Sequence, residues 1–145
     1  MLNVRRFFPP LFFIILVDQL TKFLFYQSRG GSLNNGISFS FFPSSTFLGQ
    51  TFLILTMMIF VLFLFRQFGQ KYPFLTGLIL GGAVSNVIDR ILLGGVRDFL
   101  PVPFLPVQNN MADWGIFVGL VGIGLEVVFA ELQQSVITKK NTNRH

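Results

Sequence analysis

The sequence contains no cysteine, and its single histidine is His145, the last residue. Without thiols the chain cannot form disulfides, cysteine nucleophiles or thiolate zinc sites. A histidine at a chain end, where order is usually poor, is also a weak candidate for a hydrolase base or a proton relay. The chemistry open to this chain is therefore that of carboxylates, lysine, hydroxyls and amides.

Charged residues are scarce as well, at 12% of the 145 residues, whereas 52% are hydrophobic and the mean hydropathy is +0.65. This composition is atypical of a water-soluble domain and indicates an integral membrane protein. Each helical crossing of a bilayer needs about 20 apolar residues. The chain therefore has room for four crossings with short connections, and we interpret residues 1–145 as a single membrane-embedded domain.

Four apolar segments are long enough to span a bilayer as helices, at residues 7–26, 46–65, 74–93 and 112–132. The predicted fold class is thus an all-α integral membrane protein with four transmembrane helices. Most basic residues flank these segments on one side, namely Arg5, Arg6, Arg66, Lys71, Lys139, Lys140 and Arg144. The positive-inside rule then predicts that both termini are cytoplasmic. Because the basic residues do not gather on one polar face, we expect no nucleic-acid partner.

The first segment also has the arginine pair and apolar run of a cleavable export signal. No small-residue cleavage site follows, and the apolar run continues after Asp18 and Lys22 into Phe23. We therefore expect the first helix to stay attached.

The loop after the first helix has a strand-like pattern. Asn35-Gly36 is a tight-turn signal, and Ile37, Phe39 and Phe41 alternate with serines. The pattern predicts a short outward-facing strand or hairpin, although an ordinary amphipathic loop has the same composition.

Small residues recur at four-residue steps in two of the apolar segments. Gly77, Gly81 and Ser85 lie in the third segment, and Gly115 and Gly119 lie in the fourth. Such rows let membrane helices approach closely, so helix packing is their expected role.

Ionisable residues inside a membrane are costly and often functional. Of the six acids, Asp18, Asp89, Asp98 and Asp113 are predicted at the outer end of the bundle. The two glutamates lie toward the inner side. We interpret Glu131 as an interface residue and assign no role to Glu126.

Two polar groups lie on helix faces. Asp18 and Lys22 are one turn apart, which favours a structural ion pair and also allows a role in holding substrate. Asn86, Asp89 and Arg90 share the last turn of the third segment, where an arginine fork can bind a carboxylate or carbonyl. We expect this second group to support a site.

Asp98 and Asp113 remain, with Asn110 three residues before Asp113. Taken singly, Asp98 could be a solvated loop charge and Asp113 a helix cap. Taken together, two carboxylates in one cleft can share a proton, so that one acts as base and the other as acid. Such a pair can activate water and protonate a leaving nitrogen without metal, thiol or imidazole.

Five runs of the sequence resemble the successive motifs of the lipoprotein signal peptidase (signal peptidase II) family in order and spacing. They are Asp18-Gln-Leu-Thr-Lys22, Asn34-Asn-Gly-Ile-Ser-Phe39, Gly81-Gly-Ala-Val-Ser-Asn86-Val-Ile-Asp89-Arg90, Gly94-Gly-Val-Arg-Asp98-Phe99 and Asn110-Met-Ala-Asp113. The runs touch all four predicted helices and both outward loops, so the resemblance covers nearly the whole chain.

The resemblance implies an aspartyl intramembrane endopeptidase of the bacterial cytoplasmic membrane, with its active site toward the extracytoplasmic face. Its implied substrates are diacylglyceryl-modified prolipoproteins, cut on the amino side of the lipidated cysteine. We expect a monomer that works in membrane lipid and needs no metal or cofactor. By motif position Asp98 and Asp113 match the catalytic pair. The residues that match its site-supporting positions are Asp18, Lys22, Asn34, Asn86, Asp89, Arg90 and Asn110.

The segment from Asn34 to Phe42 matches a small outward β-cradle of that family. The chain departs from the family pattern at Ser85, which replaces a glycine, at Arg97, which replaces an apolar residue, and at Gln108-Asn109. The stretch between Asp98 and Asp113 is short, and Pro101, Pro103 and Pro106 exclude a regular helix there.

Three alternatives remain open on the sequence. A small transporter or channel would place acids along the whole membrane depth. A serine peptidase would use Lys22 as base and a residue such as Ser38 as nucleophile, although Asp18 favours the charged form of Lys22. A non-enzymatic assembly subunit would not need Asp98 or Asp113.

Overall fold

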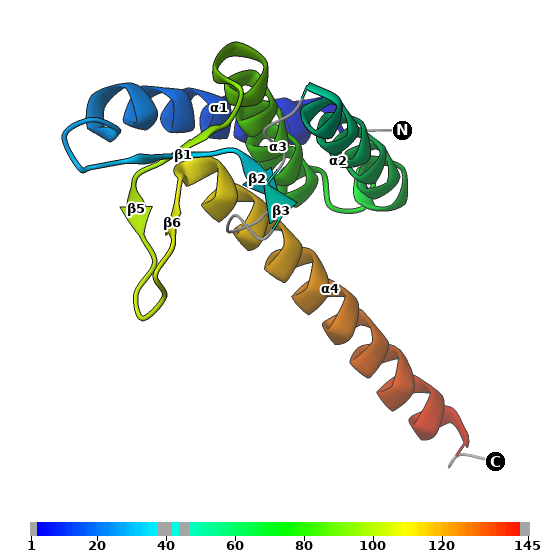
Figure 1. The fold of residues 1–145 in the computed structure, drawn as a ribbon. Coiled ribbons are helices and arrows are strands. Elements are labelled where there is room, and N and C mark those ends of the chain that lie inside the picture. The colour runs from blue at the N-terminus through cyan, green and yellow to red at the C-terminus, as the bar shows by residue number, and fades with distance from the viewer. Residues whose placement is uncertain (1–2, 38–41, 44–46, 143–145) are drawn as a thin grey trace.

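The computed structural model describes residues 3–37, 42–43 and 47–142. Its main elements are the helices α1 (Val4–Phe25), α2 (Phe47–Phe68), α3 (Pro73–Leu93) and α4 (Met111–Thr142) (Figure 1). Each contains a stretch that is long and apolar enough to cross a membrane. The prediction of a mostly helical protein with four helices that are long and apolar enough to span a membrane is therefore confirmed.

The helices differ from the predicted segments mainly at their ends. α1 begins at Val4 and contains Pro9 and Pro10, whereas the prediction started at residue 7. α4 runs to Thr142, well past the predicted end at residue 132. The sequence has no glycine or proline after Gly124 in this helix, so nothing ends it where the apolar stretch stops.

α3 lies between α1 and α4 and contacts both through small residues. A Cβ atom added to Gly77 would lie 2.5 Å from the backbone oxygen of Phe7, and one added to Gly81 would lie 2.5 Å from that of Leu11. The backbone of α1 therefore rests directly on the glycines of α3. Gly119 of α4 similarly meets the side chain of Ile79. The predicted role of these residues in close helix packing is confirmed.

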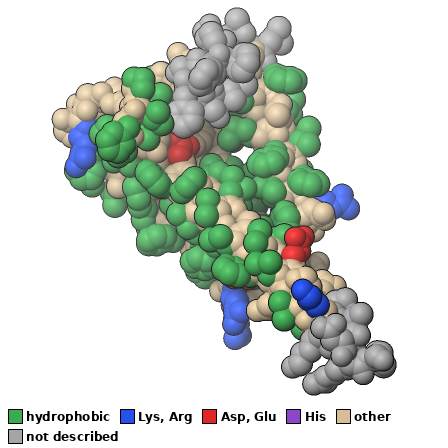
Figure 2. All heavy atoms as spheres, turned by 90° about the horizontal axis from the view of Figure 1, so that it is seen from below, with side chains coloured by type: hydrophobic (Ala, Val, Ile, Leu, Met, Phe, Trp, Pro, Cys, Tyr) green, Lys and Arg blue, Asp and Glu red, His purple; other side chains and the backbone are tan. Residues whose placement is uncertain are grey.

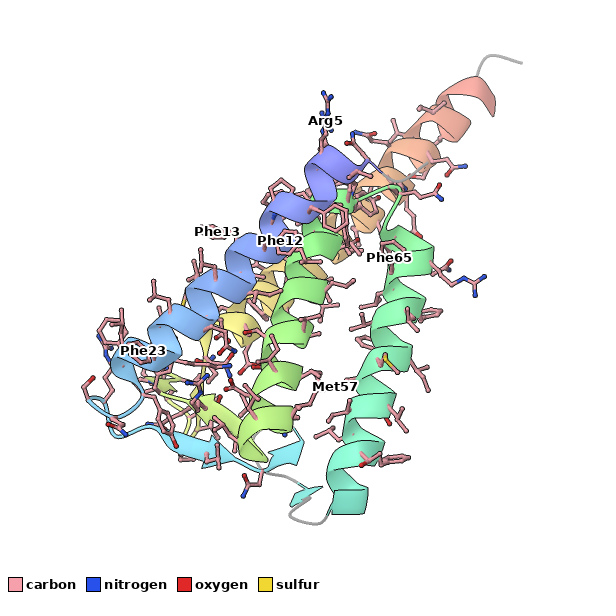
Figure 3. The ribbon with its side chains drawn as sticks, turned by 90° about the horizontal axis from the view of Figure 1, so that it is seen from above. Arg5, Phe12, Phe13, Phe23, Met57 and Phe65 are labelled. Carbon is pink, nitrogen blue, oxygen red and sulfur yellow. The ribbon has the colours of Figure 1, made fainter. Side chains whose placement is uncertain are left out.

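α2 packs against α3 near the end of the bundle that carries Arg5. Leu64 joins Ile79 and Ile123 in a small buried core, and the ring of Phe65 meets that of Phe7 edge to face at 5.4 Å. Farther along α2, Met57 lies on the side that faces α3 (Figure 3).

Much of the helix surface is apolar and exposed, as expected of a surface that contacts lipid. Phe13 and Phe23 of α1 point away from the bundle (Figure 3). Hydrophobic side chains also dominate the face of the molecule shown in Figure 2. Because exposed apolar side chains are unfavourable in water, this surface agrees with burial in a bilayer.

Three short antiparallel pairs of strands lie where α1 and α3 end and α4 begins, which we call the strand-bearing end. β1 (Ser32–Asn34) pairs with β4 (Val96–Asp98), and β2 (Gly36–Ile37) pairs with β3 (Phe42–Pro43). β5 (Leu100–Pro101) and β6 (Gln108–Asn109) form a hairpin that projects from the bundle (Figure 1). The prolines between Asp98 and Asp113 thus occur without a helix, as predicted.

The loop after α1 contains β1 and β2, in agreement with a strand-like segment. The alternating residues Ser38 to Phe41 lie outside the described residues. The predicted hairpin pattern is therefore tested only at its two ends.

Candidate active site

All nine predicted site residues lie at the strand-bearing end. They are Asp18 and Lys22 of α1, Asn34 of β1, Asn86, Asp89 and Arg90 of α3, Asp98 of β4, Asn110, and Asp113 of α4. Asn34 and Asp113 are half-buried and the other seven are buried. Figure 3 shows side-chain nitrogen and oxygen atoms gathered between α1 and α3, in the half of the bundle away from Arg5.

Lys22 is fully buried and its ammonium group contacts three acceptors. Nζ lies 2.6 Å from Oδ2 of Asp18, 3.1 Å from Oδ2 of Asp89 and 3.0 Å from Oδ1 of Asn86. An ammonium group has three N–H donors and no acceptor, so each donor has one partner. The predicted ion pair with Asp18 is present. A lysine held in this way is unsuited to act as a base, which argues against the Ser-Lys alternative.

Asp18 connects three helices. Its Oδ2 atom accepts a hydrogen bond from Oγ of Ser85 at 2.7 Å, and its Oδ1 atom accepts one from the backbone N–H of Ala112 at 2.8 Å. Ala112 lies in the first turn of α4, where backbone N–H groups have no partner within the helix. A buried carboxylate on α1 thus accepts a hydrogen bond from one of these N–H groups and stabilises the start of α4 electrostatically.

Two residues of the network, Arg97 and Gln19, were not among the predicted site residues. The guanidinium group of Arg97 donates to Oδ1 of Asp89 at 2.7 Å through Nη2 and to Oδ2 at 3.2 Å through Nε. The backbone N–H of Arg97 donates to the same Oδ2 atom at 3.0 Å. The Nη2 atom of Arg97 also donates to Oε1 of Gln19 at 2.8 Å. The bonds to Asp89 raise the pKa of Arg97 further above its ordinary value. In the sequence Arg97 directly precedes Asp98 and Gln19 directly follows Asp18, and these positions were the available signal that both residues belong to the site.

The arrangement explains why this chain tolerates an arginine before Asp98. Side chains alternate along a strand, so Arg97 points to the opposite side of β4 from Val96 and Asp98. On that side it meets Asp89, which is completely buried. Arg97 and Lys22 together give Asp89 two cationic partners, which offset the cost of burying its charge.

Asp98 is 2% exposed, so the alternative of a solvated loop charge is wrong. In the β1–β4 pair it lies opposite Ser32. Nδ2 of Asn34 donates to its Oδ2 atom at 3.0 Å, and Nδ2 of Asn110 donates to its Oδ1 atom at 2.6 Å. Burial raises the pKa of Asp98 to about 6, against the opposing effect of the Asn34 hydrogen bond. A carboxyl group with such a pKa exchanges protons readily near neutral pH.

Asp113 lies in the first turn of α4, but Asn110 caps this helix instead. Oδ1 of Asn110 accepts a hydrogen bond from the backbone N–H of Asp113 at 3.0 Å, which is the usual geometry of an N-cap. The capping role considered for Asp113 is therefore filled by another residue. The Asp113 carboxylate accepts a hydrogen bond from Nδ2 of Asn86 at 2.8 Å.

Asp98 and Asp113 line one cavity of about 590 Å³. Its walls are mostly apolar side chains of α2, α3 and α4, among them Leu53, Met57 and Phe117, and we call it the apolar cleft. Arg90 also lines this cleft and attracts both carboxylates electrostatically. The arrangement places two acidic groups from different elements beside an arginine, within a space of low polarity.

Other candidates from the sequence lie elsewhere. Glu126 is exposed on α4 and does not line the apolar cleft. Ser38 lies outside the described residues. Within residues 3–37, 42–43 and 47–142, no cluster of three or more histidine, cysteine or acidic side chains could hold a metal ion.

Comparison with known proteins identifies related sequences. The family model described as signal peptidase (SPase) II matches residues 11–129. A lipoprotein signal peptidase of Ralstonia nicotianae is 36% identical, with 74% of this chain and 75% of the relative covered. One of a Janthinobacterium species is 35% identical, with coverages of 74% and 79%. One of Caldanaerobacter subterraneus is 29% identical, with coverages of 81% and 92%.

Two solved structures of bacterial membrane enzymes, determined by the in meso method, have the same fold. The one at 2.3 Å resolution superposes with a TM-score of 0.67 at 20% identity, over 85% of this chain and 90% of the other. The one at 1.9 Å resolution gives a TM-score of 0.65 at 21% identity, over 84% and 95%. From the family match and the relatives, this chain belongs to the signal peptidase II family of membrane peptidases.

Proposed function

We propose that this chain is an aspartyl intramembrane endopeptidase that removes the signal peptide of a diacylglyceryl-modified prolipoprotein on the amino side of the lipidated cysteine. Asp98 and Asp113 are the catalytic pair. The observation that carries the proposal is that both carboxylates line the same apolar cleft. Family membership and the names of the relatives support the substrate class.

The reaction follows from the ordinary chemistry of a carboxyl pair that shares one proton. The ionised member takes a proton from a water molecule as the water oxygen attacks the carbonyl carbon. The protonated member gives its proton to the carbonyl oxygen, and the tetrahedral intermediate then collapses as a proton passes to the departing nitrogen.

The asparagines position the pair. Asn110 donates to Asp98 and accepts from the backbone of Asp113, so one side chain fixes both acids. Asn86 holds Asp113 from the other direction, and Asn34 holds Asp98 from β1. Arg90 favours the ionised member of the pair, because it attracts negative charge at either position.

The substrate enters sideways from the lipid. The apolar cleft is bordered by Leu53 and Phe60 of α2 and by Trp114 and Phe117 of α4, which suit the apolar residues of a signal peptide. Its acyl chains lie along the apolar outer surface of the same helices. Binding is then mainly hydrophobic, and the polar groups of the cleft orient the bond to be cut.

The orientation in the membrane follows from charge. We infer that both termini lie in the cytoplasm of a bacterial cell, with the chain in the cytoplasmic membrane, because most of the basic residues flank the end opposite the site. The strand-bearing end then faces outward, with β1, β2 and β3 forming a small cradle beside the site. The chain acts as a monomeric, single-domain peptidase of residues 1–145, without metal or cofactor.

The alternative of a transporter or channel predicts acids distributed along the membrane depth. The four aspartates instead gather at one end, and the remaining described acids, Glu126 and Glu131, are exposed on α4. Their distribution therefore favours a site over a continuous ion path.

A cleavage assay with a matched pair of substrates tests the proposal. The purified protein is incubated in detergent with a diacylated precursor and with its non-acylated twin, as wild type, Asp98→Asn and Asp113→Asn. We expect cleavage of the acylated precursor by wild type only, with normal yield and folding of both variants. Full activity in either variant would contradict the catalytic role of the carboxyl pair. Cleavage of both substrates at equal rates would contradict the requirement for a lipid-modified substrate.

A further inference from the structure

A second hollow of about 520 Å³ lies at the strand-bearing end. We call it the outer recess. Every residue that lines it belongs to the segments between helices: Ser32, Asn34, Asp98, Pro101, Leu105, Pro106, Val107 and Gln108. It thus lies between β1, β4 and the β5–β6 hairpin, whereas the apolar cleft is formed mainly by helices.

The two hollows meet at the candidate catalytic group. Asn34, Asp98 and Gln108 line both of them. A peptide that passes from the cleft into the recess therefore runs past Asp98. Because the cleft suits the apolar segment on one side of the cut bond, the recess lies where the chain on the other side must go.

The polar groups of the recess match a peptide backbone. Oγ of Ser32 donates to Oε1 of Gln108 at 3.0 Å, and Nε2 of Gln108 donates to the carbonyl oxygen of Gly30 at 3.4 Å. Both bonds are exposed and join β1 to β6. Exchanging such bonds for bonds to a ligand costs little, because each contributes only about 1 kcal/mol.

The position of Ser32 shows where the outer recess lies relative to Asp98. Ser32 is the cross-strand partner of Asp98, and directly opposite residues project from the same face of a strand pair. The hydroxyl of Ser32 is therefore close to the group that acts on the cut bond. The recess begins beside this bond.

We propose that the outer recess binds the residues that directly follow the lipidated cysteine, in an extended conformation, through backbone hydrogen bonds to Gln108 and Ser32. The proposal rests on the proposed function. Among the described residues that line the recess, none is Lys or Arg, so it offers neutral amide and hydroxyl groups and no countercharge for a phosphate. Its volume is that of a pocket for a small ligand, which corresponds to a short stretch of peptide.

The test compares two diacylated precursors. One continues for several residues after the lipidated cysteine, and the other ends at this cysteine as an amide. Wild type is expected to cleave the longer precursor with kcat/KM about tenfold higher, which corresponds to one or two backbone hydrogen bonds. Since both precursors carry the same lipid, this difference reports on the peptide alone.

Two variants locate the effect. Gln108→Ala is expected to lower kcat/KM for the longer precursor by a larger factor than for the truncated one, and so to remove most of the preference. Ser32→Ala should reduce the preference by a smaller factor. Gln133→Ala, exposed on α4, should leave both rates unchanged. Thermal unfolding of each variant accompanies the assay. If Gln108→Ala does not fold, the result obtained with Ser32→Ala decides the test.

The outcomes separate the two proposals. Equal cleavage of both precursors by wild type would overturn the proposal for the outer recess and leave the proposed function intact. An equal loss of kcat/KM on both precursors in Gln108→Ala would do the same. No cleavage of either precursor by wild type overturns the proposed function and the recess with it.

Discussion

The ammonium group of Lys22 on α1 donates a hydrogen bond to Oδ1 of Asn86 on α3 at 3.0 Å. This contact determines how the Asn86 amide is oriented, because a lysine can only donate and must face the amide oxygen. The amide NH2 group consequently points to Asp113, at 2.8 Å. A buried ion network on one side thus orients a donor for a proposed catalytic carboxylate on the other.

Replacing Lys22 by methionine should destabilise the protein strongly. The change leaves Asp18 buried without its cation and removes one of the two cations at Asp89. Breaking a buried ion pair in this way costs about 3–5 kcal/mol. Thermal or denaturant unfolding in detergent measures the loss, with Lys139→Met, exposed on α4, as the matched control.

The double variant Lys22→Met with Asp18→Asn separates charge from packing. We expect it to be more stable than Lys22→Met alone, since the unpaired carboxylate is gone. If Lys22→Met unfolds like the Lys139→Met control, the buried network does not support the fold.

Replacing Asn34 by alanine should change the pH dependence of cleavage. The hydrogen bond from Asn34 stabilises the ionised form of Asp98 and holds down its pKa, which burial raises to about 6. Without this bond the pKa rises further, so the ionised form needed by the pair appears only at higher pH. The acidic limb of the kcat/KM profile should therefore move to higher pH.

Ser28→Ala is the control for this experiment, because Ser28 is exposed and its hydroxyl donates to backbone oxygens of the preceding turn. Its profile should overlay that of wild type. An acidic limb of Asn34→Ala that stays in place or moves to lower pH would contradict the assignment of this limb to Asp98.

Replacing Arg97 by leucine should lower both stability and turnover. Asp89 loses its side-chain bonds to the guanidinium group and keeps Lys22, and a hydrogen bond to a charged group contributes about 1.5–3 kcal/mol. Turnover should fall as well, because Arg97 anchors β4 directly beside Asp98. Unfolding and kcat measured on the same preparations check both effects.

Arg97→Lys serves as the conservative comparison. Lysine keeps the charge but lacks the planar fork, so it should recover part of the stability and less of the turnover. Wild-type stability in Arg97→Leu would show that Asp89 needs only Lys22.

Replacing Gly81 by alanine should disrupt the contact between α1 and α3. The added Cβ atom would lie 2.5 Å from the backbone oxygen of Leu11, and overpacking of this kind costs about 1–3 kcal/mol. Gly124→Ala is the matched control, since nothing lies within 4 Å of a Cβ atom there. It should be neutral or stabilising by up to about 1 kcal/mol, from helix propensity. Equal unfolding temperatures of the two variants would contradict the close approach of α1.

Residue order by itself determined the four helices and the small residues at their contacts. Apolar length and four-residue spacing are local properties, and they persist in the structure apart from the helix ends. The polar site residues within apolar segments could also be selected from the sequence, because charged and amide groups are rare there. The ion pair of Asp18 with Lys22 was predictable for the same reason, since one helical turn separates them. Asn34, Asp98 and Asn110 lie in the segments between helices, and their match to the family motifs indicated their place in the site.

Tertiary structure alone decided how these residues are connected. That Asn110 rather than Asp113 caps α4, and that Arg97 turns back to Asp89, depends on where β4 and the start of α4 meet α1 and α3. The meeting of the apolar cleft and the outer recess at Asp98 has the same origin. Such contacts join residues far apart in the chain, and close packing of helices on glycine sets their geometry. No local pattern in the sequence carries this information.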